Sequence, residues 1–231
     1  MKLHLSGKTA VITGGAQDIG KAMAKAFAAE GCHVAVCDNG AVCDFASDVS
    51  AAYGTLDVWI NNAGILFPKP VLGQELSDFE RVIRVNLSSV FNGTQAAGKE
   101  MQKSGGGVII NSASFAGILP TAYRCSYAAS KAGIIAFTKE TAAELAPHQI
   151  RVVAIAPGMV EIGMMAERLK GPEREEILSR IAMRRCAKPE EVAELAVFLA
   201  SDAASYLTGS VYEIAGGQNC IQDIMKPWGL A

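Results

Sequence analysis

Tyr127 and Lys131, four residues apart, are the pair in this sequence best suited to proton transfer. On a helix, positions i and i+4 share a face, so the two side chains project together. A free tyrosine has a pKa of about 10, and a nearby ammonium lowers that pKa towards the range useful for acid–base catalysis. Ser114 lies thirteen residues before Tyr127 and can donate a hydrogen bond to a substrate oxygen. The three residues together predict proton transfer at a carbonyl or alcohol oxygen.

A glycine-rich turn, Thr13-Gly14-Gly15-Ala16-Gln17-Asp18-Ile19-Gly20, follows the first apolar run of the chain. Glycines allow the backbone to approach a pyrophosphate, whose charge the first amides of a following helix can hold. The next strand-like run ends at Asp38, about 20 residues further on, where an acid can bind an adenosine ribose and repel a 2′-phosphate. We therefore expect NAD rather than NADP, with a solvated acid at a strand end as the alternative reading of Asp38.

Short apolar runs alternate with segments of helical period, which predicts a doubly wound parallel sheet. Helices are expected over Ile19–Glu30, after a capping box at Ser77–Glu80, and from Pro189 onwards. We expect a single Rossmann-like α/β domain over residues 1–231, whose buried strands have near-continuous apolar sequences. The predicted strands are Thr9–Thr13, His33–Cys37, Leu56–Ile60, Val108–Asn111, Arg151–Ile155 and Val211–Ile214.

The composition is that of an ordinary globular protein. Of the 231 residues, 50% are hydrophobic and 19% are charged, and the formal net charge is −2, which argues against nucleic-acid or anionic membrane partners. No apolar stretch reaches the roughly 18 residues that span a bilayer, and the first residues do not have the apolar core of a signal peptide. With three histidines, and six cysteines without metal-ligand spacing, we expect no metal and a cytoplasmic location.

Taken in order, these motifs resemble those of the classical short-chain dehydrogenase/reductase family over Leu5–Gly217. The resemblance implies a Rossmann-type sheet, NAD(P) as cofactor, an alcohol or ketone as substrate, and a homotetramer or homodimer. The matching motifs are the glycine turn at 13–20, Asn61-Asn62-Ala63-Gly64, Asn86 in Val85-Asn86-Leu87, Ser114, Tyr127-x3-Lys131, Pro157-Gly158, Phe198–Asp202, Leu207–Gly209 and Gly216-Gly217.

The resemblance also implies a role for each site residue. Tyr127 would be the acid/base, Lys131 its modulator and a ribose ligand, Ser114 the donor to the substrate oxygen, and Asn86 a member of a water-mediated proton relay. The residues that would contact the cofactor are Gly14, Asp18, Ile19, Gly20, Asp38, Asp48, Asn62, Ala63, Gly64, Tyr127, Lys131, Pro157, Gly158 and Val160.

Three positions depart from the family pattern. Asp18 stands where the family usually has its middle glycine; its carboxylate could cap the next helix, but it brings negative charge near the pyrophosphate. Ile162 stands where a threonine often contacts the cofactor carboxamide, and Ala215 replaces an aspartate common before the paired glycines. We expect these changes to weaken or reposition cofactor binding without abolishing it.

The region after Asp38 is short for this family. A candidate third strand, Ala41–Phe45, follows Asp38 after two residues, whereas a parallel crossover needs roughly ten or more. Either this run is not a third parallel strand or the sequence omits residues there. We favour omission, with residues missing or disordered around 39–50 and a backbone break between Asp38 and Tyr53.

The shortening makes the adenine-side aspartate ambiguous. Asp48, in Ser47-Asp48-Val49-Ser50, matches the family position slightly better than Asp44 does. A partly apolar substrate wall is expected from Phe115, Ile118, Leu119, Pro120 and Met159–Leu169.

The sequence favours a dehydrogenase of a secondary alcohol, such as a polyol, sugar or cyclic hydroxyl compound. An epimerase or dehydratase is a rival, but Pro157-Gly158 and the glycine spacing favour the classical branch. The alternative outside the enzymes is a cofactor-poor or non-catalytic relative that acts as a binding or regulatory protein. Asp18 and the short region 39–50 motivate this alternative. The complete set of Ser114, Tyr127 and Lys131 argues against it.

Overall fold

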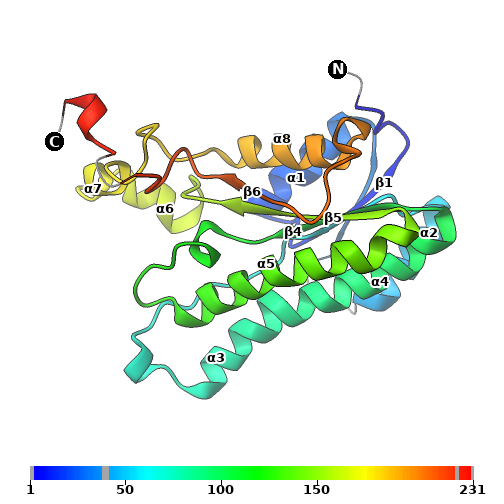
Figure 1. The fold of residues 1–231 in the computed structure, drawn as a ribbon, viewed down its shortest axis with the longest axis horizontal. Coiled ribbons are helices and arrows are strands. Elements are labelled where there is room, and N and C mark those ends of the chain that lie inside the picture. The colour runs from blue at the N-terminus through cyan, green and yellow to red at the C-terminus, as the bar shows by residue number, and fades with distance from the viewer. Residues whose placement is uncertain (1–2, 38–41, 222–223, 230–231) are drawn as a thin grey trace.

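A six-stranded parallel sheet forms the centre of the molecule, as the sequence predicts (Figure 1). The computed structural model describes residues 3–37, 42–221 and 224–229. The strand order is β2-β1-β3-β4-β5-β6, and the pairing places Thr13 beside Cys37 and Asn61 beside Asn111, so the carboxyl ends are level at one edge. The strands are β1 (Thr9–Thr13), β2 (His33–Cys37), β3 (Val58–Asn61), β4 (Gly107–Ser112), β5 (Ile150–Pro157) and β6 (Val211–Ile214).

Helices cover both faces of the sheet (Figure 1). One layer contains α1 and α8, which pack against each other, and the other contains α2, α4 and α5. None of the helices in the described ranges is long and apolar enough to cross a membrane. The helices are α1 (Asp18–Ala29), α2 (Val42–Tyr53), α3 (Leu76–Ile83), α4 (Ser89–Ser104), α5 (Cys125–Leu145), α6 (Gly163–Arg168), α7 (Arg174–Leu178) and α8 (Pro189–Ala200).

The strands are apolar along their whole length because alternate side chains point to opposite faces of the sheet and pack into two different cores. In β3, Val58 and Ile60 pack with α1 and α8, whereas Trp59 packs with α2 and α4. All three side chains are fully buried, and burial of one such side chain stabilises a fold by about 1.5–3 kcal/mol. From α1, Met23 and Phe27 fill the first core, as their spacing of one helical turn predicts.

The prediction of a third strand at Ala41–Phe45 is wrong over the residues that are described, because Val42–Tyr53 forms the helix α2. Its buried residues Ala46 and Val49 lie one turn apart and pack with α4, which a strand could not achieve. Residues 42–50 are therefore neither missing nor disordered, and no break interrupts residues 42–53. The remainder of the predicted break, with Asp38, lies outside the described residues.

The predicted capping box at Ser77–Glu80 is also wrong. Helix α3 begins at Leu76, its N-cap is Glu75, and no side chain caps it. Ser77 therefore lies inside the first turn, beyond the position from which a serine side chain caps a helix. Pro189 does open α8, and the Lys188 amide donates to the Glu191 carboxylate at 2.8 Å, which caps that helix.

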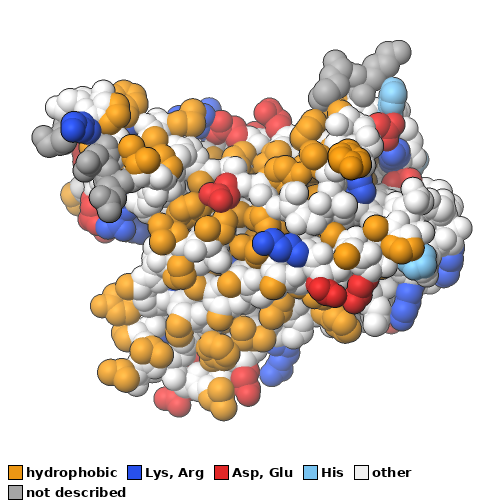
Figure 2. Space-filling view, viewed as in Figure 1, with side chains coloured by type: hydrophobic (Ala, Val, Ile, Leu, Met, Phe, Trp, Pro, Cys, Tyr) orange, Lys and Arg blue, Asp and Glu red, His pale blue; other side chains and the backbone are white. Residues whose placement is uncertain are grey.

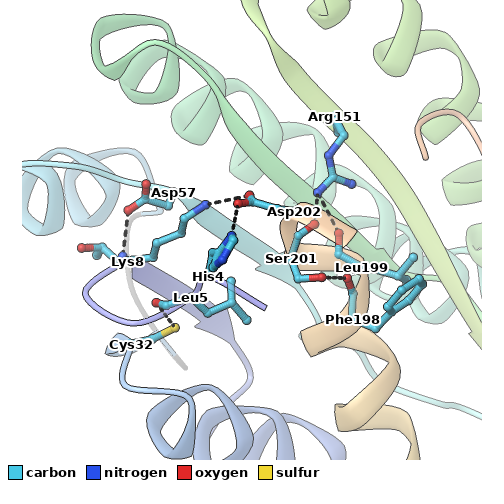
Figure 3. A network of polar contacts seen from close by, with 11 residues as sticks. His4, Leu5, Lys8, Cys32, Asp57, Arg151, Phe198, Leu199, Ser201 and Asp202 are labelled. Carbon is cyan, nitrogen blue, oxygen red and sulfur yellow. Dashed lines mark hydrogen bonds and ion pairs between the residues drawn. The ribbon is translucent and has the colours of Figure 1, made fainter. Parts of the chain in front are cut away.

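At the amino-terminal edge of the sheet, polar contacts join the end of α8 to the strands (Figure 3). The Asp202 carboxylate contacts the His4 ring at 2.9 Å and the Lys8 ammonium at 3.6 Å. The Arg151 guanidinium donates to the carbonyl oxygens of Leu199 and Leu207 at 2.8 and 3.1 Å. These contacts lie at the edge opposite the strand ends that carry the predicted site.

A buried polar network links the sheet to the helices beside it. The Trp59 indole N–H donates to Asn61 Oδ1 at 2.8 Å, and Asn61 Nδ2 donates to Asn111 Oδ1 at 2.9 Å and to Thr94 Oγ1 at 3.2 Å. Asn111 Nδ2 in turn donates to Thr138 Oγ1 at 3.0 Å. Because buried amides without partners are costly, each bond constrains the next and fixes the spacing of β3, β4, α4 and α5.

We predict that Gly93→Ala lowers the free energy of unfolding by about 1–3 kcal/mol, the usual cost of overpacking. A Cβ at Gly93 would overlap Asn61 Oδ1 and lie 2.8 Å from Trp59 Nε1. Gly98→Ala is the matched control on α4, because its added Cβ would meet only Leu145, at 3.8 Å. That variant should gain about 0.5–1 kcal/mol from helix propensity. Urea unfolding of both proteins measures the difference, and equal stabilities would contradict the role given to the network.

Candidate active site

The site lies at the carboxyl ends of β1 and β3, where the strand order reverses. From β1 the chain passes to β2 on one side and then crosses to β3 on the other, and ligands of open α/β sheets bind at such a point. Asn62 Nδ2 donates to the carbonyl oxygens of Thr13 and Gly14, both at 3.1 Å. The Thr13 hydroxyl accepts from the amides of Asn62 and Ala63 at 3.0 and 3.1 Å. These bonds hold the two predicted cofactor loops against each other.

In the glycine turn at 13–20, Gly14 and Gly20 are needed because neighbouring backbone and side-chain atoms lie too close to leave room for a Cβ. Gly14 has φ +66°, and a Cβ on it would lie 2.9 Å from Ala63 Cα. A Cβ on Gly20 would overlap the Gly14 carbonyl oxygen and lie 2.6 Å from Asn62 Nδ2. The turn can therefore bring its backbone to a phosphate only with glycine at these positions.

Asp18 opens α1 in a left-handed backbone conformation, with φ +48°. This conformation suits the glycine that the family usually has there, and aspartate tolerates it better than most residues. The N-cap is Gln17, so the expectation that Asp18 caps the helix is wrong. Its exposed carboxylate stands at the start of α1, beside the turn that would hold a pyrophosphate, and half-buried Ile19 follows it.

Helix α5 carries Tyr127 and Lys131 on one face, as their spacing predicts. Lys131 is buried, and its ammonium donates to the Ser112 carbonyl oxygen at the end of β4, at 2.6 Å. The Lys131 Nζ lies 5.7 Å from the centre of the Tyr127 ring. The hydrogen bond fixes the lysine against the sheet edge, within reach of a ligand bound there.

Burial changes the acid–base behaviour of both side chains. It lowers the pKa of Lys131 from 10.5 to about 8, because the charged ammonium is desolvated. Burial also raises the pKa of Tyr127, whereas the Ser114 side chain and the positive charge of Arg124 act in the opposite direction. The expected lowering of the Tyr127 pKa by Lys131 is therefore not found: Lys131 is not among the groups that shift this pKa, and desolvation of the phenol outweighs the effects of Ser114 and Arg124.

Ser114 lies next to the phenol at the start of a 3-10 helix, Phe115–Gly117. Its hydroxyl accepts from the Ala116 amide at 3.2 Å, and this bond fixes the side chain. A Cβ on Gly117 would lie 2.7 Å from the Lys131 carbonyl carbon, so a glycine is needed where this segment packs on α5. The hydroxyl of Ser114 keeps its own proton free to donate to an oxygen held between Ser114 and Tyr127.

Asn86 is fully buried within a short π-helix, Arg84–Ser88, between α3 and α4. Its amide accepts from the Ile65 N–H at 2.8 Å and donates to the Ile65 carbonyl and Ser130 hydroxyl, at 3.0 and 3.1 Å. Gly64 lies between Asn86 and Lys131, since a Cβ on it would be 3.3 Å from Asn86 Oδ1 and 3.5 Å from Lys131 Nζ. Asn86 thus holds the Asn61–Gly64 loop beside Lys131, and π-helical turns of this kind often occur at functional sites.

The segment after β5 lies at the same edge of the sheet. The Gly158 amide donates to the Ile214 carbonyl at 3.0 Å, directly after Pro157, and Val160 is buried. A Cβ on Gly158 would lie 2.8 Å from Ala215 Cα. Ile162 packs its side chain against the core, so it presents no hydroxyl in place of the family threonine.

Neither adenine-side candidate is placed at this cluster by the described part of the structure. Asp38 follows β2 in the sequence and lies outside the described residues. Asp48 is exposed in the middle of α2. Among residues 3–37, 42–221 and 224–229, no group of three acids, cysteines or histidines could hold a metal ion.

Two residues at the site were missed from the sequence. Thr13 joins both loops through its hydroxyl, and its position as the last residue of the first strand was the available signal. Arg124 acts on the Tyr127 phenol, and a cation three residues before the tyrosine was the signal. A depression of about 380 Å³ lies elsewhere, lined by α3 and the π-helix that follows it and by none of the predicted site residues.

Two family profiles match the chain. The profile described as "Enoyl-(Acyl carrier protein) reductase" matches residues 36–219, and the profile described as "short chain dehydrogenase" matches residues 8–43. The two matches overlap at residues 36–43, from the end of β2 to the start of α2.

Named relatives cover nearly the whole chain. A 3-oxoacyl-[acyl-carrier-protein] reductase of Thermotoga maritima is 40% identical over 244 residues, covering 93% of this chain and 99% of the relative. A 3beta-hydroxysteroid dehydrogenase of Eggerthella lenta is 37% identical over 245 residues, covering 92% of this chain and 94% of the relative. Both alignments exceed the 231 residues of this chain, so each relative has residues without a counterpart here.

A solved structure has the same fold. The crystal structure of a short-chain type dehydrogenase/reductase from Mycobacterium marinum superposes with a TM-score of 0.87 at 33% identity, covering 94% of this chain and 97% of that one.

We predict that burial of Lys131 makes the free energy of unfolding depend on pH between about 8 and 10.5. In this window the unfolded chain binds more protons than the folded one, so stability rises with pH. Tyr127→Phe keeps the lysine, whereas Tyr127→Phe/Lys131→Met lacks it. The unfolding free energy of the first variant minus that of the second should increase by up to about 3 kcal/mol as the pH rises through this window. Tyr127→Phe removes the phenol titration, and Lys139→Met, at an exposed position of α5, is the control. A difference independent of pH would contradict desolvation of the ammonium.

Proposed function

Because this chain belongs to the short-chain dehydrogenase/reductase family, as its motifs predict, we propose that it is an NAD-dependent oxidoreductase. It interconverts a secondary alcohol, such as a polyol, sugar or cyclic hydroxyl compound, and the corresponding ketone. The observation that carries the proposal is the position of Ser114, Tyr127 and Lys131, which meet at the sheet edge beside the Asn61–Gly64 loop. Residues 1–231 act together as one NAD(P)-binding domain.

In this proposal Ser114 and Tyr127 bind the same substrate oxygen. During oxidation the Tyr127 phenolate takes the hydroxyl proton, and during reduction the phenol returns it. When bound, the nicotinamide accepts or supplies the hydride. Lys131 has an ammonium held by Ser112 and can bind a ribose hydroxyl, while Asn86 positions the loop that faces it.

The residues at the switch point fit a dinucleotide. Gly14 and Gly20 leave room for backbone to reach a pyrophosphate, and the first turn of α1 supplies a positive helix end. Asn62, Ala63, Pro157 and the rest of the predicted cofactor residues at this edge complete the binding surface. Asp18 opposes binding through its charge, so we expect a lower affinity than a glycine there would give.

The names of the relatives support a carbonyl or hydroxyl on a secondary carbon as the reacting group. One is a reductase of 3-oxoacyl groups on acyl carrier protein, and another is a dehydrogenase of a 3beta-hydroxysteroid. Those substrates differ in size and polarity, and the apolar wall at Phe115, Ile118 and Leu119 suits the less polar members of the proposed class.

We also propose a homotetramer or homodimer in the cytoplasm. Figure 2 shows hydrophobic side chains gathered at the surface around α3. Leu72 before α3, Leu76 at its start and Phe91 on α4 are 100, 70 and 51% exposed. Exposed apolar side chains in such numbers are typical of contacts between subunits. The described cysteines are free thiols, as is usual in a reducing compartment.

A cofactor-poor binding protein is the second candidate, favoured by the charge of Asp18 and by the short region 39–50 of the sequence. Titration with NADH separates the two candidates before any substrate is known. Enhanced nicotinamide fluorescence on binding supports the oxidoreductase, whereas unchanged fluorescence would support the second candidate.

We predict that Tyr127→Phe lowers turnover by about 10² or more, the scale of a lost acid–base group. The substitution removes only the hydroxyl, so the fold and NADH affinity should stay nearly unchanged. Turnover with a panel of secondary alcohols and nicotinamide fluorescence measure the two effects. Tyr206→Phe, at a side chain 99% exposed and remote from the site, is the matched control. Substantial turnover by folded Tyr127→Phe protein would refute the mechanism.

We predict a higher kcat/KM with NAD than with NADP, because Asp38 follows β2 directly in the sequence and a carboxylate there repels a 2′-phosphate. Asp38→Ala should shift the ratio of the two kcat/KM values towards NADP by about tenfold or more, the effect of losing a charged hydrogen bond. Glu140→Ala, which removes an exposed acid from α5, should leave the ratio unchanged. Faster turnover of NADP by the unaltered protein, at equal low concentrations, would contradict the assignment.

A further inference from the structure

Arg124 stands at the start of the helix that carries Tyr127. It is the N-cap of α5, and its carbonyl accepts the first helical hydrogen bond, from the Ala128 amide at 2.8 Å. Tyr127 is the third residue of the same helix. Side chains at the N-cap and at the third helical position are neighbours, as the reciprocal bonds of a capping box illustrate. The guanidinium and the phenol therefore leave the same end of α5.

The charge of Arg124 acts at the reacting hydroxyl, where it lowers the pKa of Tyr127 against the larger effect of burial. Helix stability gives no reason for an arginine at this position. Serine, threonine, aspartate and asparagine are the favoured N-caps, Arg124 makes no capping bond, and a cation is unfavourable at the positive end of a helix.

Arg124 also has no carboxylate partner among the residues that the structure describes. The arginines around α6 and α7 are different, since Arg168, Arg180 and Arg184 each contact a glutamate. Arg81 and Arg84 resemble Arg124 in forming no ion pair within the described ranges, but both are exposed to solvent. Arg124 is half-buried, so its unpaired charge has less water around it.

We propose that Arg124 binds a carboxylate of the substrate, so that the protein acts on hydroxy acids and their oxo acids. The inference rests on the proposed function and narrows its substrate class. A planar guanidinium binds a carboxylate through two parallel hydrogen bonds, which would orient the reacting carbon against Tyr127 and Ser114. Ile118 and Leu119, on the loop before Arg124, leave an apolar wall for the rest of a short chain.

The test uses pairs of compounds that differ only in charge: 2-, 3- and 4-hydroxy acids and their methyl esters, each with NAD and with NADP. The unaltered protein should prefer at least one acid over its ester. Arg124→Gln should lower kcat/KM for that acid by roughly 10- to 100-fold more than kcat/KM for the ester, mainly through KM. Arg124→Lys should recover part of the loss, because it keeps the charge without the planar fork.

Lys139→Gln is the matched control, because it removes one positive charge from an exposed position of the same helix. It should leave both substrates unaffected. The pH profile gives a second readout that a merely structural arginine would not move. Because Arg124 lowers the pKa of Tyr127, Arg124→Gln should shift the midpoint of ester oxidation to higher pH, and Lys139→Gln should not.

The outcomes separate the two proposals. Equal losses on acid and ester in Arg124→Gln, or no preference for any acid in the unaltered protein, would overturn the carboxylate assignment and leave the oxidoreductase intact. Preference for a hydroxyalkyl phosphate over the acid of equal length would also overturn it. Absence of turnover with every compound and both cofactors would overturn the carboxylate assignment, and unchanged nicotinamide fluorescence on titration with NADH would overturn the proposed function as well.

Discussion

The hydrogen bonds between the ends of β1 and β3 join the sheet at the point where its strand order reverses. Thr13 and Asn62 use their side chains to satisfy backbone groups of the opposite loop, because two diverging strand ends leave those groups without sheet partners. The same bonds require glycine at Gly14 and Gly20, where added methyl groups would push the loops apart. The geometry that joins β1 to β3 therefore also places a turn without side chains at Gly14 and Gly20 beside the start of α1, which is what a phosphate needs.

Lys131 connects this edge to the helix layer at a cost. A charged ammonium that is buried with one carbonyl partner is less stable than the same ammonium in water. The lowered pKa of Lys131 reflects this cost. Gly64 and Asn86 lie close to it, so a ligand hydroxyl bound there would supply a further hydrogen-bond partner. The residue that destabilises the folded protein is thus the one that a bound ribose would stabilise most, which links cofactor binding to stability.

The sequence predicted what depends on short-range periodicity. The pair Tyr127 and Lys131 follows from helical spacing alone, and the strands follow from runs of apolar residues. The run Ala41–Phe45 was misread as a strand because five residues do not distinguish a buried strand from the first turn of a helix, and α2 begins at Val42. The raised pKa of Tyr127 depends on burial by distant segments. The role proposed for Arg124 depends on its position as the N-cap of α5. Neither could be read from local pattern, because both are set by tertiary packing.

In the described part of the sheet, β2 has a partner on one side only, since it pairs with β1 and ends the strand order. Its five residues, His33–Cys37, include neither lysine nor proline, the residues by which edge strands commonly resist pairing with another chain. Val36 is 39% exposed there. Strand addition between copies can therefore begin at β2 as well as at β6, the strand that ends the order on the other side, and at β2 none of the five residues is of a type that commonly prevents it.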